Sequence, residues 1–367
     1  MLLGYTVGIT ADRRWEEQSG LFERRGASVQ HGPSIRTLPL GSDQRLRAAT
    51  DAVIARRPTV LVANTGLGIR SWFSAAETWG VAEPLTDALR LARIYARGPK
   101  ASGAVQLHGL EVEERAPTER LRDAVELAMG ALRPGDVVAL QLDGSGASEE
   151  ANRLRAAGID VIELPVYEWT MPADVAPARR LVEDVIAGRI QAVTFTAGPA
   201  IHNLMDIAAE RDLDVALRAA LTSGRTVLGC VGPVCAEVAA RHGLASPQLV
   251  VPRTWRLGPL VRAVADRLAE RTLTVELATS TMTIAGNHVT VDDESVVLTD
   301  TEARVLTMLA SEPNHVYAKS DLLRDVWRDE DADPHVVEAV VNRLRRRLGP
   351  SGRSISAVYR RGYTLRV

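Results

Sequence analysis

The chain has 367 residues, of which 46% are hydrophobic and 25% charged, and its formal net charge is −2. This length exceeds one ordinary domain core and the composition is that of a globular chain, so we expect two or three domains. A net charge so close to zero argues, taken alone, against a nucleic-acid-binding protein.

The two cysteines, Cys230 and Cys235, exclude a disulfide framework. We expect them to be small core residues, because two thiols alone make a poor zinc site. Neither a metal site nor a cofactor is expected. No apolar run approaches the ~20 residues that span a bilayer, and the first residues lack the pattern of a signal peptide. The sequence therefore predicts a cytoplasmic protein without a membrane segment.

Residues 1 to about 255 contain a faint duplication. TVLVANTGLGIRSWFSAAETWG (59–80) parallels QAVTFTAGPAIHNLMDIAAERD (191–212), and two further pairs of segments repeat at spacings of 131 and 134 residues. Each unit is a short strand, a turn with Gly or Pro and an Ala-rich helix, which predicts parallel sheets covered by helices. We expect two α/β lobes with a ligand cleft between them. A helix over 258–271 is expected to end this part of the chain.

The pattern changes at Leu273. Apolar and polar residues alternate from there, and the alternation is broken at Gly286-Asn287 and at Asp292-Asp293. Such short alternating runs separated by turn residues predict a small antiparallel sheet.

Three helices and a hairpin are expected to follow this sheet. Thr299 can cap the first helix, with Glu302 completing a capping box. The second helix covers about 319–327, and the third follows Pro334. The final residues, SISAVYRRGYTLRV, predict two strands joined by a turn that contains glycine.

Charge is distributed unevenly along the chain. Residues 1–272 carry 32 basic and 32 acidic groups, residues 273–332 carry 4 and 12, and residues 333–367 carry 8 and 2. The near-neutral total therefore hides a C-terminal helix and hairpin of net charge +6. Positive charge confined in this way favours contact with nucleic-acid phosphates, which reverses the inference from the whole chain.

Helical periodicity divides the third helix into two faces. With Leu344 toward the core, four residues fall on the opposite face: His335, Ala339, Asn342 and Arg346. Exposed Asn and Arg suit the major groove, because Asn pairs with adenine and Arg with guanine. Arg343 and Arg345 fall on the flanks of this face, where we expect them to bind phosphates.

The C-terminal residues resemble the OmpR/PhoB-type winged-helix DNA-binding domain. The marks of the resemblance are LTDTEARVL, SDLLRDVW, VVEAVVNRLRRRL and RRGYTLRV. It implies a domain over 273–367 that binds double-stranded DNA, in pairs on tandem half-sites. It also implies a recognition helix at about 334–348 and a wing at 354–367, with Arg360 and Arg361 near the minor groove or backbone. Nothing in the chain resembles the phosphorylated receiver domain of such regulators, so the two lobes are the expected input.

Residues 1 to about 265 resemble uroporphyrinogen-III synthase (HemD), through ITADRR, RRGASVQHGPSIRTLPL, ANTGLGIRSWFSAAETWG, ELPVYEW, TFTAGPAI and VGPVCAEVAARHGL. The resemblance implies that 1–36 and 168–265 form lobe 1, that 37–167 form lobe 2, and that two strands cross between them. In that family the cleft binds hydroxymethylbilane, a linear tetrapyrrole with eight carboxylates, inverts one ring and closes the macrocycle.

A polycarboxylate ligand needs hydrogen-bond donors and positive charge. Backbone N–H groups at helix starts can supply the first, and arginine or lysine the second. The candidate ligand-binding residues at strand-to-helix turns and nearby are Arg13, Thr65, Gly66, Arg97, Lys100, Ala197, Gly198, Gly232 and Arg253. A linear tetrapyrrole or another anionic small molecule is the expected ligand.

The resemblance also bears on catalysis. Tyr167 falls where the synthases carry the Tyr thought to assist hydroxyl loss, and Thr196 matches the Thr of their Thr-Ser turn. The Ser position is Ala197 here, which weakens the catalytic interpretation. Tyr167 could equally be a strand aromatic that packs between the lobes.

Three functions remain open. The favoured one is a transcriptional regulator whose synthase-like module senses a ligand, because a basic recognition helix has little use in a biosynthetic step. The second is an active synthase with an accessory DNA-binding domain, and the third is a DNA-bound scaffold that binds another protein. Actinobacterial proteins of this fused type resemble regulators of nitrate and nitrite assimilation, so such promoters are the expected targets.

Overall fold

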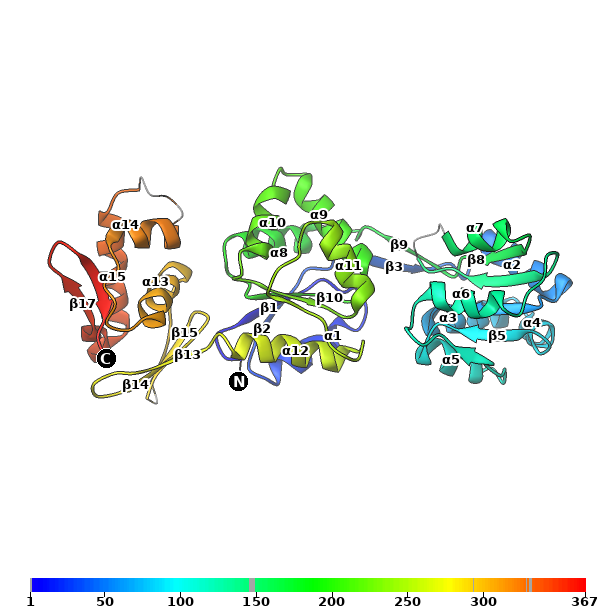
Figure 1. The fold of residues 1–367 in the computed structure, drawn as a ribbon, viewed down its shortest axis with the longest axis horizontal. Coiled ribbons are helices and arrows are strands. Elements are labelled where there is room, and N and C mark those ends of the chain that lie inside the picture. Colours follow the sequence, from blue (N-terminus) through cyan, green and yellow to red (C-terminus); the bar gives the residue numbers. More distant parts are fainter. Residues whose placement is uncertain (1, 145–148, 293, 328, 330–331) are drawn as a thin grey trace. The chain divides into compact units, whose positions relative to one another are not determined.

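The computed structural model describes residues 2–144, 149–292, 294–327, 329 and 332–367 (Figure 1). The chain divides into two compact units, Arg36–Thr170 and Met1–Ile35 with Met171–Val367. The first unit is lobe 2. The second unit contains lobe 1 and the C-terminal domain. The lobe junctions expected from the sequence, after residues 36 and 167, lie beside these boundaries.

Lobe 1 is built on a parallel sheet of five strands in the order β12-β11-β10-β1-β2. All residues of β10 and β11 are buried, as expected for strands inside a parallel sheet that helices cover on both faces. The strands are β1 (Thr6–Ile9), β2 (Ser28–His31), β10 (Ala192–Phe195), β11 (Val227–Cys230) and β12 (Leu249–Val250). The helices are α1 (Trp15–Glu23), α8 (Ala176–Ile186), α9 (Gly198–Ala209), α10 (Asp214–Thr222), α11 (Pro233–Arg241) and α12 (Leu257–Ala269).

The two cysteines lie inside lobe 1, as expected. Cys230 ends β11 with no exposed surface, and Cys235 in α11 is 3% exposed. Hydrogen bonding with Cys230, together with burial, raises the pKa of the Cys235 thiol well above its usual range. Both side chains therefore pack inside lobe 1 as small core residues.

Lobe 2 repeats the same plan, with a five-stranded parallel sheet in the order β6-β5-β4-β7-β8. Its strands are β4 (Val60–Ala63), β5 (Arg93–Ala96), β6 (Glu114–Arg115), β7 (Val137–Gln141) and β8 (Asp160–Leu164). Its helices are α2 (Gln44–Arg56), α3 (Gly66–Thr78), α4 (Ala82–Leu89), α5 (Pro99–Gln106), α6 (Leu121–Met129) and α7 (Glu149–Ala156). Trp72 of α3 is fully buried and donates to Thr50 Oγ1 at 2.9 Å.

The two sheets confirm the duplication. The two sheets have the same strand order when each strand of lobe 1 is matched to its counterpart in the repeat: β12-β11-β10-β1-β2 corresponds to β6-β5-β4-β7-β8. Each sheet combines strands from both halves of the duplicated sequence. In lobe 1 the central strand β10 pairs with β1, and in lobe 2 the central strand β4 pairs with β7. A separate antiparallel pair, β3 (Arg36–Pro39) with β9 (Tyr167–Thr170), joins the ends of lobe 2.

The C-terminal domain begins with an antiparallel sheet of four strands, β13 (Leu273–Glu276), β14 (Thr281–Ala285), β15 (His288–Val291) and β16 (Glu294–Val297). Alternate residues of β14 are buried, Met282 and Ile284 among them, as the sequence alternation predicted. The turn at Gly286-Asn287 joins β14 to β15. Of the second predicted turn, Asp292 is described and Asp293 lies outside the described residues.

The helices of this domain are α13 (Asp300–Ser311), α14 (Lys319–Leu322), which continues as a π-helical turn, and α15 (His335–Arg347). Thr299 and Glu302 form the expected capping box: Thr299 N donates to Glu302 Oε2 at 2.9 Å, and Glu302 N to Thr299 Oγ1 at 3.4 Å. A 3-10 helix over Gly349–Ser354 then leads into the hairpin of β17 (Ile355–Val358) and β18 (Gly362–Leu365).

The predicted second helix is therefore not uniform. Leu323–Trp327 form a π-helical turn rather than a continuation of α14. The wider turn allows Leu322, Leu323 and Val326 to face the core together, and each is 2% exposed or less. In the part of the chain that is described, no helix is long and apolar enough to span a membrane.

Candidate nucleic-acid interface and ligand sites

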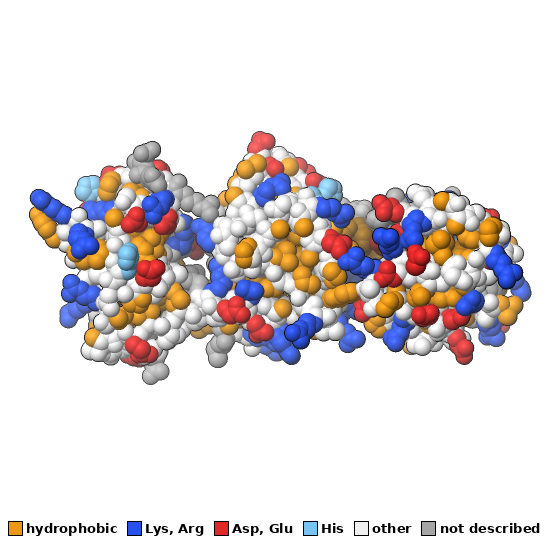
Figure 2. Space-filling model, viewed as in Figure 1, with side chains coloured by type: hydrophobic (Ala, Val, Ile, Leu, Met, Phe, Trp, Pro, Cys, Tyr) orange, Lys and Arg blue, Asp and Glu red, His pale blue; other side chains and the backbone are white. Residues whose placement is uncertain are grey.

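Helix α15 separates its residues into a core face and an exposed face. Val337, Val341 and Leu344 have no exposed surface and pack in the core of the C-terminal domain. His335, Ala339, Asn342 and Arg346 are exposed, so the face deduced from the helical period is confirmed. Basic side chains gather on the part of this domain that holds α15 and β17 (Figure 2).

The two flanking arginines are held by contacts inside the domain. Arg343 Nε lies 3.7 Å from Glu302 Oε1. Arg345 is half-buried: its Nε donates to Ile355 O at 2.9 Å, and its guanidinium lies 5.9 Å from the centre of the Tyr363 ring. Arg345 is thus directed toward the hairpin, whereas Arg346 is free to extend from the exposed face.

The first turn of α15 is tied to α14. Lys319 Nζ pairs with Glu338 Oε1, and His335 Nδ1 lies 3.2 Å from Glu338 Oε2. The Lys319 ammonium, followed by His335, holds the pKa of Glu338 below its usual range. These contacts orient His335 at the start of the candidate reading helix.

The turn of the hairpin carries an exposed aromatic beside the two predicted wing arginines. Tyr359 is 81% exposed, and the Arg360 guanidinium lies 5.1 Å from the centre of its ring. Arg360 has φ 57°, a left-handed backbone conformation that is typical of tight turns. The sequence reasoning missed Tyr359, although an aromatic next to two arginines in a predicted turn is a recognisable signal.

In lobe 2 the candidate ligand turn at Thr65-Gly66 is rigidly held. Thr65 caps α3 by accepting from Gly68 N at 3.0 Å. Gln141, at the end of β7, accepts from the backbone N of Asn64 and of Thr65 at 3.0 and 3.1 Å, and donates to Thr65 Oγ1 at 2.9 Å. The sequence reasoning did not identify Gln141, whose role depends on two strands that are distant in the sequence.

Arg97 and Lys100 lie beside this turn. Arg97 Nε donates to Glu119 O at 2.7 Å and its Nη1 donates to Asn64 Oδ1 at 3.1 Å. A Cβ added to Gly66 would come within 2.3 Å of Lys100 O, so only glycine allows the starts of α3 and α5 to approach so closely. The structure therefore brings Thr65, Gly66, Arg97 and Lys100 together at the carboxyl ends of β4 and β5.

In lobe 1 the candidate residues follow β1, β10, β11 and β12, which are consecutive in the sheet. Ala197 precedes α9 without a side-chain cap. Pro199 has no N–H group and Ala200 N donates to Ala197 O at 3.2 Å, so this helix start offers fewer free N–H groups than the sequence predicted. A Cβ at Gly232 would lie 3.2 Å from Trp255 Cγ. Arg13 and Arg253 are exposed, and neither has an ion pair with any described residue.

A buried polar cluster lies behind this edge and was not predicted. Gln18 Nε2 donates to Thr194 Oγ1 at 2.9 Å, and Thr10 Oγ1 donates to Thr194 O at 2.9 Å. Gln18 Oε1 is buried and finds no hydrogen-bond partner in the described part of the chain. Nearby, Trp15 stacks on His31 with ring centres 4.1 Å apart. The cluster fixes the loop that carries Arg13.

The two catalytic candidates lie in different units. Tyr167 is 5% exposed and packs in the core of lobe 2, next to Trp169. Thr196 is half-buried at the end of β10 in lobe 1. Tyr167 therefore occupies a packing position in its unit, whereas Thr196 lies at the carboxyl end of β10, next to the candidate residue Ala197. No cluster of described residues has the composition of a metal site.

Two duplicated α/β lobes followed by a winged-helix domain with a basic reading helix define a DNA-binding protein with an attached α/β module. Residues 16–262 match the family described as uroporphyrinogen-III synthase HemD, and residues 293–365 match the C-terminal domain of transcriptional regulatory proteins. The chain belongs to the uroporphyrinogen-III synthase HemD family, with a fused OmpR/PhoB-type DNA-binding domain.

Individual relatives divide in the same way. The uncharacterized protein YjjA of Bacillus subtilis is 24% identical over 74% of this chain and 98% of its own length. The structure of a mutant uroporphyrinogen III synthase from Thermus thermophilus is 26% identical, covers 72% of this chain and 99% of its own, and superposes with a TM-score of 0.58. The heme response regulator HssR of Staphylococcus epidermidis is 32% identical over 22% of this chain and 36% of its own length.

The fusion identifies the chain as a transcriptional regulator whose C-terminal domain binds double-stranded DNA. This confirms the DNA-binding part of the sequence interpretation.

Proposed function

We propose that the synthase-like module senses an anionic small molecule, with a linear tetrapyrrole as the expected class, and controls DNA binding by the winged-helix domain. The main observation behind this proposal is that a two-lobed synthase-like module is fused to a DNA-binding domain. The helix α15 of that domain exposes four residues on one face, among them Asn342 and Arg346. Pairing on tandem half-sites and nitrate or nitrite promoters stay predictions of the resemblance.

The ligand edges of the lobes support an anionic ligand. Each has a helix that starts at the carboxyl end of a parallel strand, where the helix dipole favours negative charge. Exposed arginines without ion pairs, Arg13 and Arg253, stand at the edge of lobe 1.

A contact inside the second unit supports communication between lobe 1 and the C-terminal domain. A Cβ at Gly286, in the β14–β15 turn, would lie 2.4 Å from Gly4 O, and one at Gly4 would lie 2.3 Å from Ala285 O. Ala285 packs against the core of lobe 1, and Tyr5 Oη lies 3.3 Å from Thr272 Oγ1. A ligand that shifts lobe 1 can therefore act on the first sheet of the reader as well as through α12.

Gly286→Val should disrupt this contact, because the added side chain meets the Gly4 backbone at a left-handed φ of 59°. A ligand effect on DNA affinity of the usual ~5- to 150-fold is expected to fall toward one, while DNA binding without ligand persists. The measurement is DNA anisotropy with and without freshly formed hydroxymethylbilane.

Gly80→Ala is the matched control, because Gly80 also has positive φ but no atom within 4 Å of an added Cβ. If the ligand changes DNA affinity by the same factor in Gly286→Val, in Gly80→Ala and in the native chain, the contact between Gly4 and Gly286 does not transmit the ligand effect.

The synthase alternative is tested with hydroxymethylbilane and the full chain. We expect no type III isomer beyond spontaneous closure, because Ala197 lacks the hydroxyl of the family's turn and Tyr167 is 5% exposed. Formation of excess type III isomer that is lost in Thr196→Val would establish the chain as an active synthase instead. Absence of turnover together with a ligand effect on DNA affinity supports the sensor.

A further inference from the structure

A groove of about 790 Å³ lies in lobe 2 between α5 and the edge of the sheet at β6. One side of the groove is the outer face of α5, and the other side is the segment 112–117, which contains β6. The four candidate ligand residues of lobe 2 do not line it. The groove is therefore separate from the candidate ligand edge.

The groove is elongated, because it follows α5 from Gly98, which precedes the helix, to Gln106 at its end. Eight helical residues span about 12 Å, which is the length of about four residues of an extended chain. Small residues face the groove along this length. Ser102 is 6% exposed, and a Cβ added to Gly103 would meet no atom within 4 Å. The helix therefore leaves room for the side chains of a bound segment.

The opposite side of the groove is an open sheet edge. β6 is the last strand of its sheet, and among the described strands it pairs only with β5. Glu113 N and Ala116 N donate to Ile94 O and Ala96 O, both at 2.9 Å, which holds this segment beside β5. An edge strand presents backbone N–H and C=O groups on its unpaired side, and another extended chain can pair with them.

The floor of the groove holds a polar group without a partner. The Ser102 side chain is more than nine-tenths buried and lines the groove, and its hydroxyl makes no hydrogen bond with any residue in the described ranges. Buried hydroxyl groups in proteins nearly always have a hydrogen-bond partner. An occupant of the groove can supply the missing one.

The groove also carries an excess of negative charge. Residues 111–119 contain four glutamates and one arginine. Glu113 is paired with Arg93, whereas Glu114 and Glu119 form no ion pair with any residue that the structure describes. Arg115 is the one basic residue among those that line the groove. The carboxylates that are not neutralised favour a positively charged occupant.

Contacts with the start of α5 fix the position of Glu119. Arg97 Nε donates to Glu119 O at 2.7 Å, and the Glu119 backbone has a left-handed φ of 53°. A Cβ added to Gly98 would lie 3.3 Å from Glu119 Oε2, so this carboxylate stands beside the first turn of α5. One acidic group is therefore already in place at this end of the groove.

We propose that the groove between α5 and β6 binds a basic, extended segment of a partner protein. The segment adds a strand beside β6 and directs lysine or arginine side chains toward Glu114 and Glu119. The open sheet edge and the length of the groove favour a polypeptide over a small amine. This interaction concerns lobe 2 alone and does not depend on the sensing of an anionic ligand.

The test titrates the full chain into a fluorescent hexapeptide of alternating lysine and valine, blocked at both ends, and follows binding by anisotropy. Saturable binding is expected in the native chain. A loss of affinity of about tenfold or more is expected in Gly103→Leu, which fills the groove, and in Glu114→Gln/Glu119→Gln, which removes the two free carboxylates. Leucine favours the helix and its Cβ meets no atom, so Gly103→Leu should keep α5 intact.

Each variant has a matched control. Gly258→Leu adds the same side chain to α12 of lobe 1, where an added Cβ also meets no atom within 4 Å. Glu77→Gln/Glu83→Gln removes two exposed carboxylates of lobe 2 that lie outside the groove. Both controls should bind the peptide as the native chain does. Hydrogen exchange of the α5 amides shows that each variant keeps this helix.

Two further probes separate an added strand from simple attraction between charges. The same peptide with N-methylated backbone amides keeps its charge but cannot pair with β6, so it should bind about tenfold more weakly or less. Spermidine should not displace the bound peptide at equal concentration. Equal binding of the methylated peptide, or displacement by spermidine, would overturn the proposal in favour of a site for amines. Absence of saturable binding, or equal affinity in variants and controls, would overturn it as well.

Discussion

Replacement of Glu302 by alanine is expected to lower the free energy of unfolding of the C-terminal domain by about 2–4 kcal/mol. The Glu302 side chain has no exposed surface, and Arg343 and Arg347 approach its two oxygens at 3.7 and 3.1 Å. The substitution leaves both arginines without their anion and removes half of the capping box at the start of α13. The arginines are about half exposed, so the loss falls below that of a fully buried pair.

Hydrogen exchange of the amides in α13 and α15 measures this effect within the full chain, because it reports the stability of each domain separately. Thr299→Ala is the control, since it removes the cap bond to Glu302 N but keeps the carboxylate, and it should cost about 1 kcal/mol. A cost for Glu302→Ala no greater than that for Thr299→Ala would mean that the ion pairs to α15 contribute nothing.

Arg346→Ala is expected to weaken specific DNA binding by about 1–3 kcal/mol and to relax the base preference at one position. Arg346 lies on the exposed face of α15, one helical turn from Asn342, where a guanidinium can reach guanine in the major groove. A duplex selected by the native chain from a random pool supplies the specific site, and a scrambled duplex the reference. Affinity is measured by anisotropy on both.

Arg360→Ala provides the contrast. Arg360 stacks on Tyr359 at the turn of the hairpin, so it is expected to contact the backbone and to weaken binding to both duplexes alike. Arg262→Ala, an exposed position in lobe 1, controls for the loss of one charge. Equal losses on specific and scrambled DNA for Arg346→Ala would contradict the base-reading role.

Local pattern was sufficient for much of this molecule. The Thr299 capping box, the exposed face of α15 and the closing hairpin all depend on residues within a few positions of one another, and all were correctly predicted. The duplication was visible for the same reason, because strand, turn and helix recur together. The π-helical turn after α14 was missed, since its cause is the packing of Leu323 against distant core residues.

The site residues that escaped prediction share one property, which is that their partners are far away in the sequence. Gln141 donates a hydrogen bond to Thr65, 76 residues away in the sequence, and Gln18 donates one to Thr194, 176 residues away. A period or a motif carries no information about such pairs. Tyr359 is the exception, because its turn and its charged neighbours were already evident.

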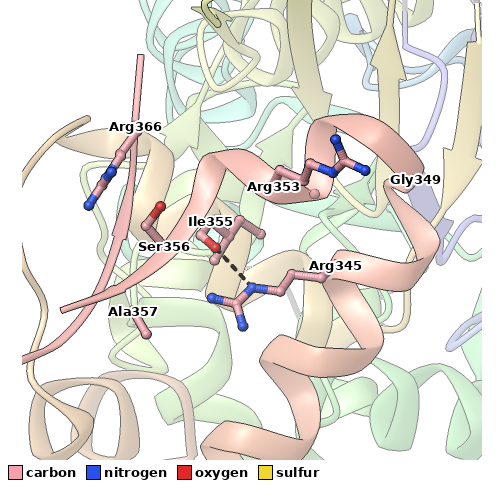
Figure 3. A pocket seen from close by; sticks show the side chains of 8 residues that line it. Arg345, Gly349, Arg353, Ile355, Ser356, Ala357 and Arg366 are labelled. Atoms are coloured by element: carbon pink, nitrogen blue, oxygen red, sulfur yellow. Dashed lines mark hydrogen bonds between the residues drawn. The ribbon is translucent and has the colours of Figure 1, made fainter. Parts of the chain in front are cut away.

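Two features could be predicted from the sequence: the two duplicated α/β lobes with their DNA-binding domain, and the concentration of positive charge in residues 333–367. Charge type and hydrophobic period are properties of neighbouring residues, so they can be read along the chain. Which of these arginines face solvent and which are held inside the domain depends on the fold. It directs Arg346 outward, anchors Arg343 and Arg347 on the buried Glu302, and turns Arg345 toward Ile355 O (Figure 3). The contacts of Glu302 join α13 to α15 across about 40 residues of sequence, so no local pattern encodes them.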